Sequence, residues 1–219
     1  MVKKQARTLT PVEYRRLIDA IPEQHRLMIQ VAFESGLRCV KLIALRPRHL
    51  DLDHGRLTVT ETIVEVPLRA APNGQRMYVK PYPKDSEPRA LGLYPELLDQ
   101  LARAHRMGSA RTICCSRPGP APRSPATPSA PAWTPAVRAS GVDYNVRIHY
   151  LRHAHASWLL AGGSDLCSVM DRMGHSLIQT TQKYLHALPD ADQRNLDAFR
   201  SIAASAEHSG IQEETEPDA

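Results

Sequence analysis

Aromatic residues, cysteines and long apolar runs are all scarce in this chain of 219 residues. Phe, Trp and Tyr together make up 5% of the sequence, which argues against an aromatic-rich β-sandwich. The four cysteines have neither the paired spacing of a zinc site nor the density of a secreted disulfide scaffold, so we expect free thiols. No stretch approaches the roughly 18 apolar residues of a membrane span, and the first ten residues lack the apolar run of a signal peptide. We therefore predict a soluble, cytoplasmic protein without a membrane partner.

The charge of the chain is uneven along its length. The formal net charge is +5, and residues 207–219 contribute five acidic side chains and no Lys or Arg, so residues 1–206 carry +10. A domain this basic is suited to a polyanion such as nucleic acid. The polar, acidic tail beyond residue 206 is expected to be disordered.

Helix-start and helix-stop signals organise the amino-terminal part of the chain. Residues 10–13 (TPVE) form a capping box with Pro at the first helical position, which predicts a helix over residues 11–20. A second apolar stripe ends at Gly36, a natural left-handed cap. A short third helix is predicted over residues 40–45, because Pro47 prevents it from continuing further.

The middle of the chain favours a small antiparallel β-sheet. Residues 57–66 are β-branched and partly alternating, and residues 78–79 and 91–93 are weaker strand candidates. Residues 72–74 (PNG) are a turn signal, and the loop over residues 81–88 is expected to project from the sheet.

Helical signals alternate with one proline-rich stretch in the rest of the chain. A helix is predicted over residues 95–105. Residues 117–135 hold seven prolines, from which we predict an irregular segment without helix or strand. Further helices are predicted, with Ser164 as a cap, over residues 149–161, 164–173, 178–185 and 190–204. The predicted fold class is mainly α with a small antiparallel β-sheet.

Three segments of this carboxyl-terminal part carry side chains that could bind an anion or take part in a reaction. His149 and Arg152 lie three residues apart, on one face of the predicted helix, and together can grip an anion. His175 follows a helix-ending glycine, and Tyr184 lies nine residues further on. His149 and His153 also have the spacing of two metal ligands, but no Glu follows the first His and no Cys stands near, so a zinc site is disfavoured.

The ordered combination of these motifs resembles the catalytic domain of the tyrosine recombinase, or phage integrase, family. The strongest part of the resemblance begins at His149, in HYLRHAHASWLLAGGSDLCSVMDRMGHSLIQTTQKYLHALPD. A second block is ESGLRCVKLIALRPRHLDLDHGRL, and YPKDSEPRALGL is similar to the hairpin that carries the family's lysine. The resemblance implies the tyrosine recombinase catalytic-domain fold over residues 1–206. As departures from the family, we expect an irregular insert at 117–135 and the absence of the amino-terminal core-binding domain that its members generally carry.

The resemblance implies a catalytic set of six residues. Arg38 and Arg152 match the two arginines that clamp the scissile phosphate, and His149 and His175 match the two histidines that flank it. Two planar, bidentate cations favour a five-coordinate transition state, because that state gains a second negative charge.

Tyr184 matches the nucleophile, and Lys84 is the best match for the lysine that protonates the leaving 5′ oxygen, with Lys80 as the alternative. His149 could accept the phenol proton, because Tyr, with a solution pKa of about 10, needs a base and a positive field to attack. A covalent 3′-phosphotyrosine preserves the energy of the broken bond, so no ATP, metal or other cofactor is required.

The implied function is site-specific recombination of double-stranded DNA, as in the integrases of phages and other mobile elements. Recombination joins two duplexes, so the resemblance also implies a homo-oligomer on DNA, generally a tetramer, and an accessory DNA-bending protein is a candidate partner. The helix at 190–204 is the candidate for docking on a neighbouring copy. A topoisomerase with the same tyrosine chemistry is a related alternative.

The chain departs from the family pattern in ways that leave other hypotheses open. Lys41 stands where the family usually has an acid, three residues after the arginine of GLR, and it adds positive charge near Arg38. The prolines of residues 111–137 are expected to forbid the helix that the family has there. A truncated or catalytically crippled DNA-binding remnant of an integrase is therefore the main alternative, and a decayed product that barely folds is another.

Overall fold

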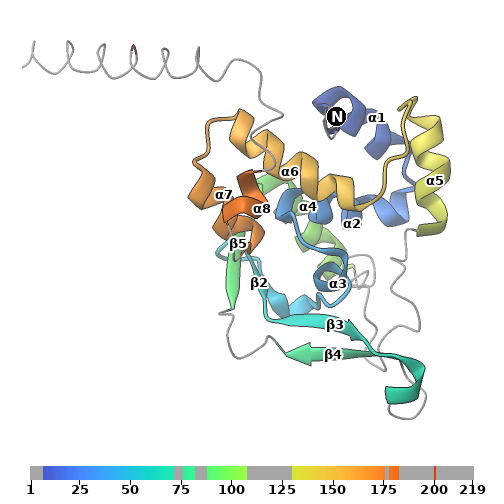
Figure 1. Cartoon of the computed structure of the whole chain (residues 1–219), viewed down its shortest axis with the longest axis vertical. Coiled ribbons are helices and arrows are strands. Elements are labelled where there is room, and N and C mark those ends of the chain that lie inside the picture. Colours follow the sequence, from blue (N-terminus) through green and yellow to red (C-terminus); the bar gives the residue numbers. More distant parts are fainter. Residues whose placement is uncertain are drawn as a thin grey trace, which may run out of the picture.

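The fold consists mainly of helices, with two small antiparallel sheets at one end (Figure 1). In this computed structural model the described residues are 7–71, 76–81, 88–107, 130–175, 178–182 and 200. Helix α6 crosses the upper part of the molecule in Figure 1, with α1 and α5 on one side and α7 and α8 on the other. The hairpin of β3 and β4 lies at the opposite end. The predicted fold class is confirmed.

The first two helices end where local signals predict. Helix α1 spans Pro11–Ala20 and has a complete capping box, in which the Thr10 hydroxyl accepts from the Glu13 amide and the Glu13 carboxylate accepts from the Thr10 amide. Helix α2 spans Glu23–Ser35 and ends at Gly36, whose φ of 59° is left-handed.

The third helix is shorter than predicted. Helix α3 spans Cys39–Leu42, and the chain then tightens into turns with bonds from the Ala44 and Leu45 amides to carbonyls three residues earlier. A 3₁₀ turn, η1 (Pro47–His49), follows directly. Because a residue before proline avoids the helical region, residue 46 is extended and the helix cannot run on to η1.

The strands form two sheets instead of the single predicted one. One sheet has the order β1 (Leu50–Asp51), β2 (Arg56–Val59) and β5 (Arg89–Gly92). The other pairs β3 (Glu61–Glu65) with β4 (Met77–Pro81), which places Thr62 opposite Lys80. The predicted strand over residues 57–66 is therefore two strands that break at Thr60, because its two halves pair with different partners. A 3₁₀ turn, η2 (Leu68–Ala70), follows β3.

Helix α5 contradicts the prediction that the proline-rich segment has no helix up to residue 135. Helix α4 spans Pro95–Arg106 as expected, and α5 spans Ala130–Ala139 with Pro135 inside it. Pro135 is exposed, while Trp133 and Ala136 are buried. The indole N–H of Trp133 donates to the carbonyl of Val146 at 2.7 Å. This packing offsets the cost of the proline.

The carboxyl-terminal helices carry the histidine and arginine motifs. Helix α6 spans His149–Ala161, α7 spans Leu166–Met173, and α8 spans Ile178–Gln182. The cap of α7 is Asp165 and not the predicted Ser164, since the Asp165 carboxylate accepts from the Ser168 amide at 2.8 Å.

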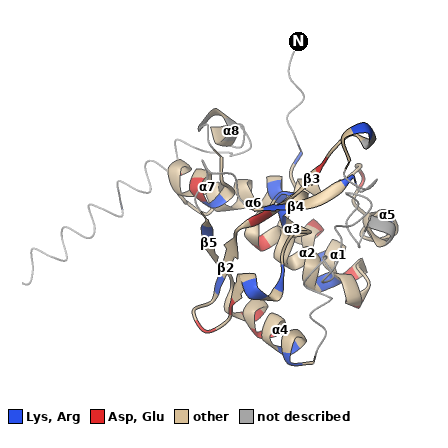
Figure 2. Cartoon of the chain, turned by 90° about the horizontal axis from the view of Figure 1, so that it is seen from below, with Lys and Arg blue, Asp and Glu red and all other residues tan. Residues whose placement is uncertain are grey.

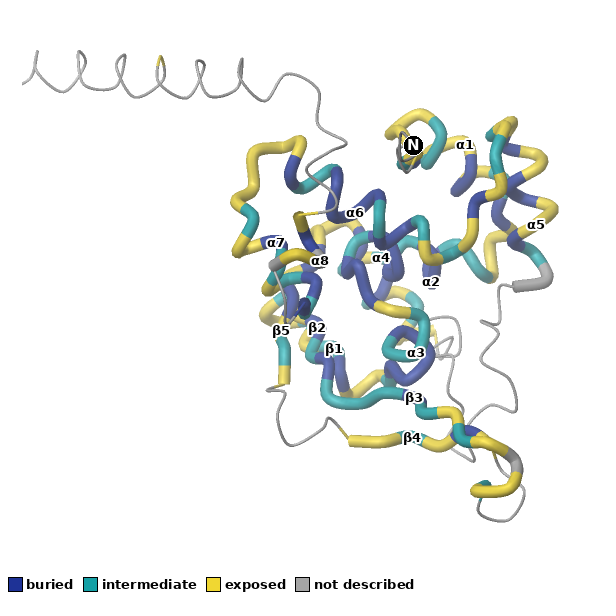
Figure 3. The backbone as a smooth tube through the Cα atoms, viewed as in Figure 1, coloured by how far each residue is buried: buried dark blue, intermediate teal, exposed yellow. Residues whose placement is uncertain are grey.

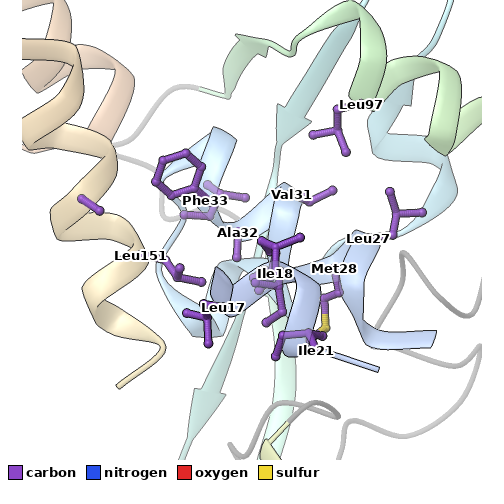
Figure 4. Close-up of a cluster of buried hydrophobic side chains, with 14 of the residues drawn as sticks. Leu17, Ile18, Ile21, Leu27, Met28, Val31, Ala32, Phe33, Leu97 and Leu151 are labelled. Carbon is purple, nitrogen blue, oxygen red and sulfur yellow. The ribbon is translucent and has the colours of Figure 1, made fainter. Parts of the chain in front are cut away.

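The main core lies between α1, α2, α4 and α6 (Figure 4). Helices α2 and α6 are largely buried, whereas β4 is largely exposed (Figure 3). Tyr14, Phe33 and Trp158 join α1, α2 and α6 through ring centroids 4.0–5.8 Å apart, and the Trp158 indole donates to the Leu9 carbonyl at 2.8 Å. Each such ring pair contributes about 0.5–1.5 kcal/mol beyond its buried area.

Several predictions fall outside the described residues. They concern the turn at 72–74, most of the loop at 81–88, residues 117–129, the helix at 190–204 apart from residue 200, and the acidic tail. Within the described part of the chain, no helix has the length and apolarity to cross a membrane.

Candidate active site

Arg152 joins the ends of two helices at the centre of the candidate site. It lies in the first turn of α6 and is 3% exposed. Its Nη1 donates to the carbonyl of Gly36, and its Nη2 donates to the carbonyl of Met173 at 2.8 Å. Arg152 therefore ties the carboxyl ends of α2 and α7 to α6.

His175 contacts Arg152 directly, and this contact defines its tautomer. His175 Nε2 lies 2.7 Å from Arg152 Nη2, and Nδ1 lies 2.8 Å from the hydroxyl of Thr181 in α8. Because a guanidinium only donates, Nε2 must be the unprotonated acceptor, and Nδ1–H donates to Thr181. Burial, followed by the charges of Arg152, Arg38 and Arg89, lowers the pKa of His175 to about 4. His175 is thus a neutral, oriented imidazole at pH 7.

Arg38 and His149 complete the described part of the candidate site. Arg38 immediately precedes α3 and His149 is the first residue of α6, and both residues are exposed overall. Burial, then the charges of Arg152 and Arg38, lowers the pKa of His149. The charge of Arg38 thus contributes to the lowered pKa of both His149 and His175. The structure brings these four of the six predicted residues into one positive field.

Two left-handed glycines allow this close packing. Gly36 has a φ of 59°, and a Cβ there would lie 2.5 Å from Cδ2 of the buried His155. Gly174 has a φ of 61°, and a Cβ there would lie 1.9 Å from Nη1 of Arg89. A side chain at Gly36 would meet backbone strain and a clash with the buried His155 ring, whereas one at Gly174 would meet backbone strain and displace the end of the Arg89 side chain.

The remaining two predicted residues, Lys84 and Tyr184, lie outside the described residues. The alternative lysine, Lys80, is exposed on β4, and Lys41 is half-buried on α3. Lys and Arg positions are spread over several elements, including α4 and β5 (Figure 2).

Three further residues at the site went unnoticed in the sequence: His155, Arg172 and Arg89. Arg172 donates to carbonyls at the ends of α2 and β5, and Arg89 donates to the Asp171 carbonyl at 3.4 Å. Their partners are up to 138 residues away in the chain, so no local motif marks them. Within the described ranges, no group of three or more His, Cys, Asp or Glu side chains could hold a metal ion.

Comparison with solved structures defines the fold. The chain superposes on the Tn1549 transposon integrase in complex with transposon right end DNA with a TM-score of 0.68 and 17% identity, over 91% of this chain and 67% of that one. It superposes on the catalytic domain of bacteriophage HP1 integrase with a TM-score of 0.56 and 17% identity, over 87% of this chain and 93% of that domain. The fold is that of a tyrosine recombinase catalytic domain.

Sequence comparison places the chain in a family. The model of the phage integrase family matches residues 7–190, and the chain belongs to that family. It is 28% identical to an integrase/recombinase of Escherichia coli over 82% of this chain, and 26% identical to tyrosine recombinase XerC of Syntrophus aciditrophicus over 76%. The chain spans 59% and 50%, respectively, of the lengths of these curated relatives.

Proposed function

We propose that this chain carries out site-specific DNA recombination of the phage-integrase type, by strand cleavage and rejoining through a 3′-phosphotyrosyl intermediate. The observation that carries the proposal is the convergence of Arg38, His149, Arg152 and His175 where α2, α6 and α7 meet. Two arginines and two neutral histidines in one positive field suit a phosphodiester. Membership of the phage integrase family supports the same chemistry.

In the proposed reaction, Arg38 and Arg152 bind the nonbridging oxygens of the scissile phosphate. Their charges stabilise the transition state more than the ground state, because the phosphoryl group gains negative charge as the nucleophile approaches. His175, held between Arg152 and Thr181, orients the Arg152 guanidinium and is itself neutral.

Tyr184 is the proposed nucleophile. Its phenol oxygen forms a bond to phosphorus while the bond from phosphorus to the 5′ oxygen breaks. His149 accepts the phenol proton, which its lowered pKa permits because the imidazole is neutral at pH 7. Lys84 donates a proton to the departing 5′ oxygen. Attack by a 5′ hydroxyl of another strand reverses these steps and rejoins the DNA.

The proposed substrate and partners follow from this chemistry. Double-stranded DNA is the substrate, so the site of action would be the cytoplasm. Exchange between two duplexes requires several copies, and we propose a tetramer on DNA, with an accessory bending protein as a further partner. We also propose that residues 1–206 form the catalytic domain and that residues 207–219 form a separate acidic tail.

A DNA-binding remnant without activity is the second candidate function, and Lys41 favours it. Lys41 lies in α3, one turn after Arg38, where the resemblance leads us to expect an acid. The positive charge of Lys41 repels the cationic groups of the phosphate clamp, of which Arg38 is one. Replacement of Lys41 by Glu in an inactive chain would restore cleavage if this residue is the defect.

The first experiment compares plasmid relaxation and detergent-resistant protein–DNA adducts for the wild type and Tyr184→Phe, on DNA that includes the flanks of the gene. Tyr94→Phe is the matched control, because Tyr94 is 69% exposed at the start of α4 and removal of its hydroxyl leaves the site intact. Relaxation and adducts that vanish only in Tyr184→Phe would support the enzyme. A folded, DNA-binding wild type without either activity would favour the remnant.

A further inference from the structure

Arg172 of α7 lies next to the candidate site and connects α7 to three other elements. Its Nη2 donates to the carbonyl of Glu34 at 3.0 Å and to the carbonyl of Gly92 at 2.9 Å. Its Nε donates to Nε2 of His155 at 3.3 Å. The guanidinium therefore links α7 to the end of α2, to the end of β5 and to α6.

His155 is a neutral bridge between Arg172 and α2. It is 5% exposed, and burial, followed by the charges of Arg172 and Arg152, lowers its pKa to about 3. Its hydrogen bond to the Phe33 backbone opposes this shift. Since Nε2 accepts from Arg172, Nδ1–H is the donor to the Phe33 carbonyl.

These contacts converge on the last turn of α2. The final carbonyls of a helix have no partner within the helix and carry partial negative charge. Here the carbonyls of Phe33, Glu34 and Gly36 accept from His155, Arg172 and Arg152, respectively. The ring of His155 also lies against the Cα of Gly36, where a Cβ would approach it to 2.5 Å. The turn is held from two sides by side chains of α6 and α7.

Arg38 follows this turn by two residues and begins α3. Its carbonyl accepts from the amides of Lys41 and Leu42 at 2.9 and 3.0 Å, so the path from Gly36 to Arg38 sets the direction of the short helix as well. Arg152 bonds to the Gly36 carbonyl of this turn but is also anchored on the Met173 carbonyl of α7, so a shift of the turn would move Arg38 relative to Arg152.

We propose that His155 and Arg172 are positioning residues that fix the Glu34–Gly36 turn and thereby place Arg38 opposite Arg152. Neither residue belongs to the phosphate clamp; both act through Arg38. The consequence for cleavage rests on the proposed function, whereas the consequence for the turn does not.

Arg26 provides a matched control for a purely structural arginine. It too is half-buried and donates to carbonyls at a helix end, those of Asp19 and Ile21 at 3.4 and 3.3 Å, but that end belongs to α1. Loss of Arg26 should loosen the α1–α2 connection and leave Arg38 in place.

The first measurement is hydrogen–deuterium exchange of the full chain in the wild type, Arg172→Leu, His155→Phe and Arg26→Leu. We expect exchange of the Lys41 and Leu42 amides to accelerate about tenfold in Arg172→Leu and His155→Phe, as for loss of one hydrogen bond to a charged or buried group. Arg26→Leu should leave those two amides unchanged. Equal exchange at Lys41 and Leu42 in Arg172→Leu and the wild type would overturn the proposal, whether or not the chain cleaves DNA.

The second measurement tests whether Arg172 acts through Arg38. In pre-bound complexes with nicked DNA, Arg172→Leu should slow adduct formation about tenfold while DNA affinity changes less than about twofold. In an Arg38→Ala background the same substitution should have little further effect. Full additivity with Arg38→Ala would contradict a positioning role and indicate only lost stability.

Two controls separate the possible failures. Arg172→Lys keeps the charge but lacks the planar fork, so it should give an intermediate exchange rate; it also replaces Arg172→Leu if the leucine variant does not fold. A wild type that forms no adduct would refute the proposed function, and the exchange rates would still decide whether His155 and Arg172 hold the turn.

Discussion

Substitution of Gly36 by alanine tests the packing at the candidate site in one step. The new methyl group would meet the ring of His155 at 2.5 Å and the sulfur of Met173 at 3.0 Å. Both neighbours are buried, and the His155 ring is held on two sides by hydrogen bonds. We therefore expect the site to relax only in part.

Gly141 is the reference for the loss of stability expected in Gly36→Ala. Gly141 has a φ of 72° but nothing within 4 Å of its virtual Cβ, so Gly141→Ala reports backbone strain alone. Left-handed strain costs about 1–2 kcal/mol, partly offset by about 0.4–1 kcal/mol from the stiffer unfolded chain. We expect about 1 kcal/mol for Gly141→Ala. Overpacking adds about 1–3 kcal/mol at Gly36, which gives a total near 3 kcal/mol.

Urea and thermal unfolding of the two variants measure this difference. For a chain of this size, the extra ~2 kcal/mol at Gly36 corresponds to a Tm about 4–8 °C below that of Gly141→Ala. A second substitution, His155→Ala, should make the Gly36→Ala change less costly, because it removes the ring that clashes. Equal destabilisation by Gly36→Ala and Gly141→Ala would refute the packing described at the α2 end.

Three further predictions concern stability. Trp158→Phe should cost about 1–2 kcal/mol in urea unfolding, because the Leu9 carbonyl loses its indole donor while the aromatic packing largely remains. Asp165→Ala should cost about 1 kcal/mol and Ser164→Ala much less, since Asp165 caps α7; the reverse order would contradict this cap. The folded pKa values of His155 and His175, about 3 and about 4, lie below the ordinary value of 6.5. The unfolded chain therefore binds more protons in acid, and stability should be constant above about pH 6.5 and fall as the pH drops towards 4; a flat profile over that window would count against buried, neutral histidines.

Elements defined by local signals could be predicted closely from the sequence. Helix α1 spans the predicted residues, and its start is set by the capping box within residues 10–13. The ends of α2 and α7 follow from Gly36 and Gly174, whose left-handed conformation is a property of glycine itself. The resemblance to the integrase family in turn identified Arg38, His149, Arg152 and His175 as neighbours, which the helix register and the caps then explain.

Features that depend on distant partners could not be predicted. Residues 57–66 look like one strand, but their two halves hydrogen bond to different strands, β5 and β4. Helix α5 forms despite Pro135 because Trp133 is buried and bonds to the backbone of Val146. Neither tertiary contact is visible in local sequence.

Arg172 and His155, which pack next to the candidate site, could not be predicted for the same reason. Arg172 donates to the carbonyls of residues 34 and 92, and a single arginine in the last turn of a helix carries no signal of such contacts. Its role follows only from the meeting of α2, α6 and α7. Tyr184 and Lys84 lie outside the described residues, and their proposed roles as nucleophile and proton donor come from the resemblance.

The central claim is that the phosphate clamp of Arg38 and Arg152 serves a nucleophilic tyrosine. Mass spectrometry of the peptide that stays attached to DNA after cleavage of a nicked substrate tests it most directly. We predict one phosphotyrosyl peptide, linked through Tyr184 and missing in Tyr184→Phe and in Arg152→Ala, with Tyr94→Phe unchanged. A linkage at another residue, or a folded chain that binds DNA and yields no linked peptide, would contradict the claim.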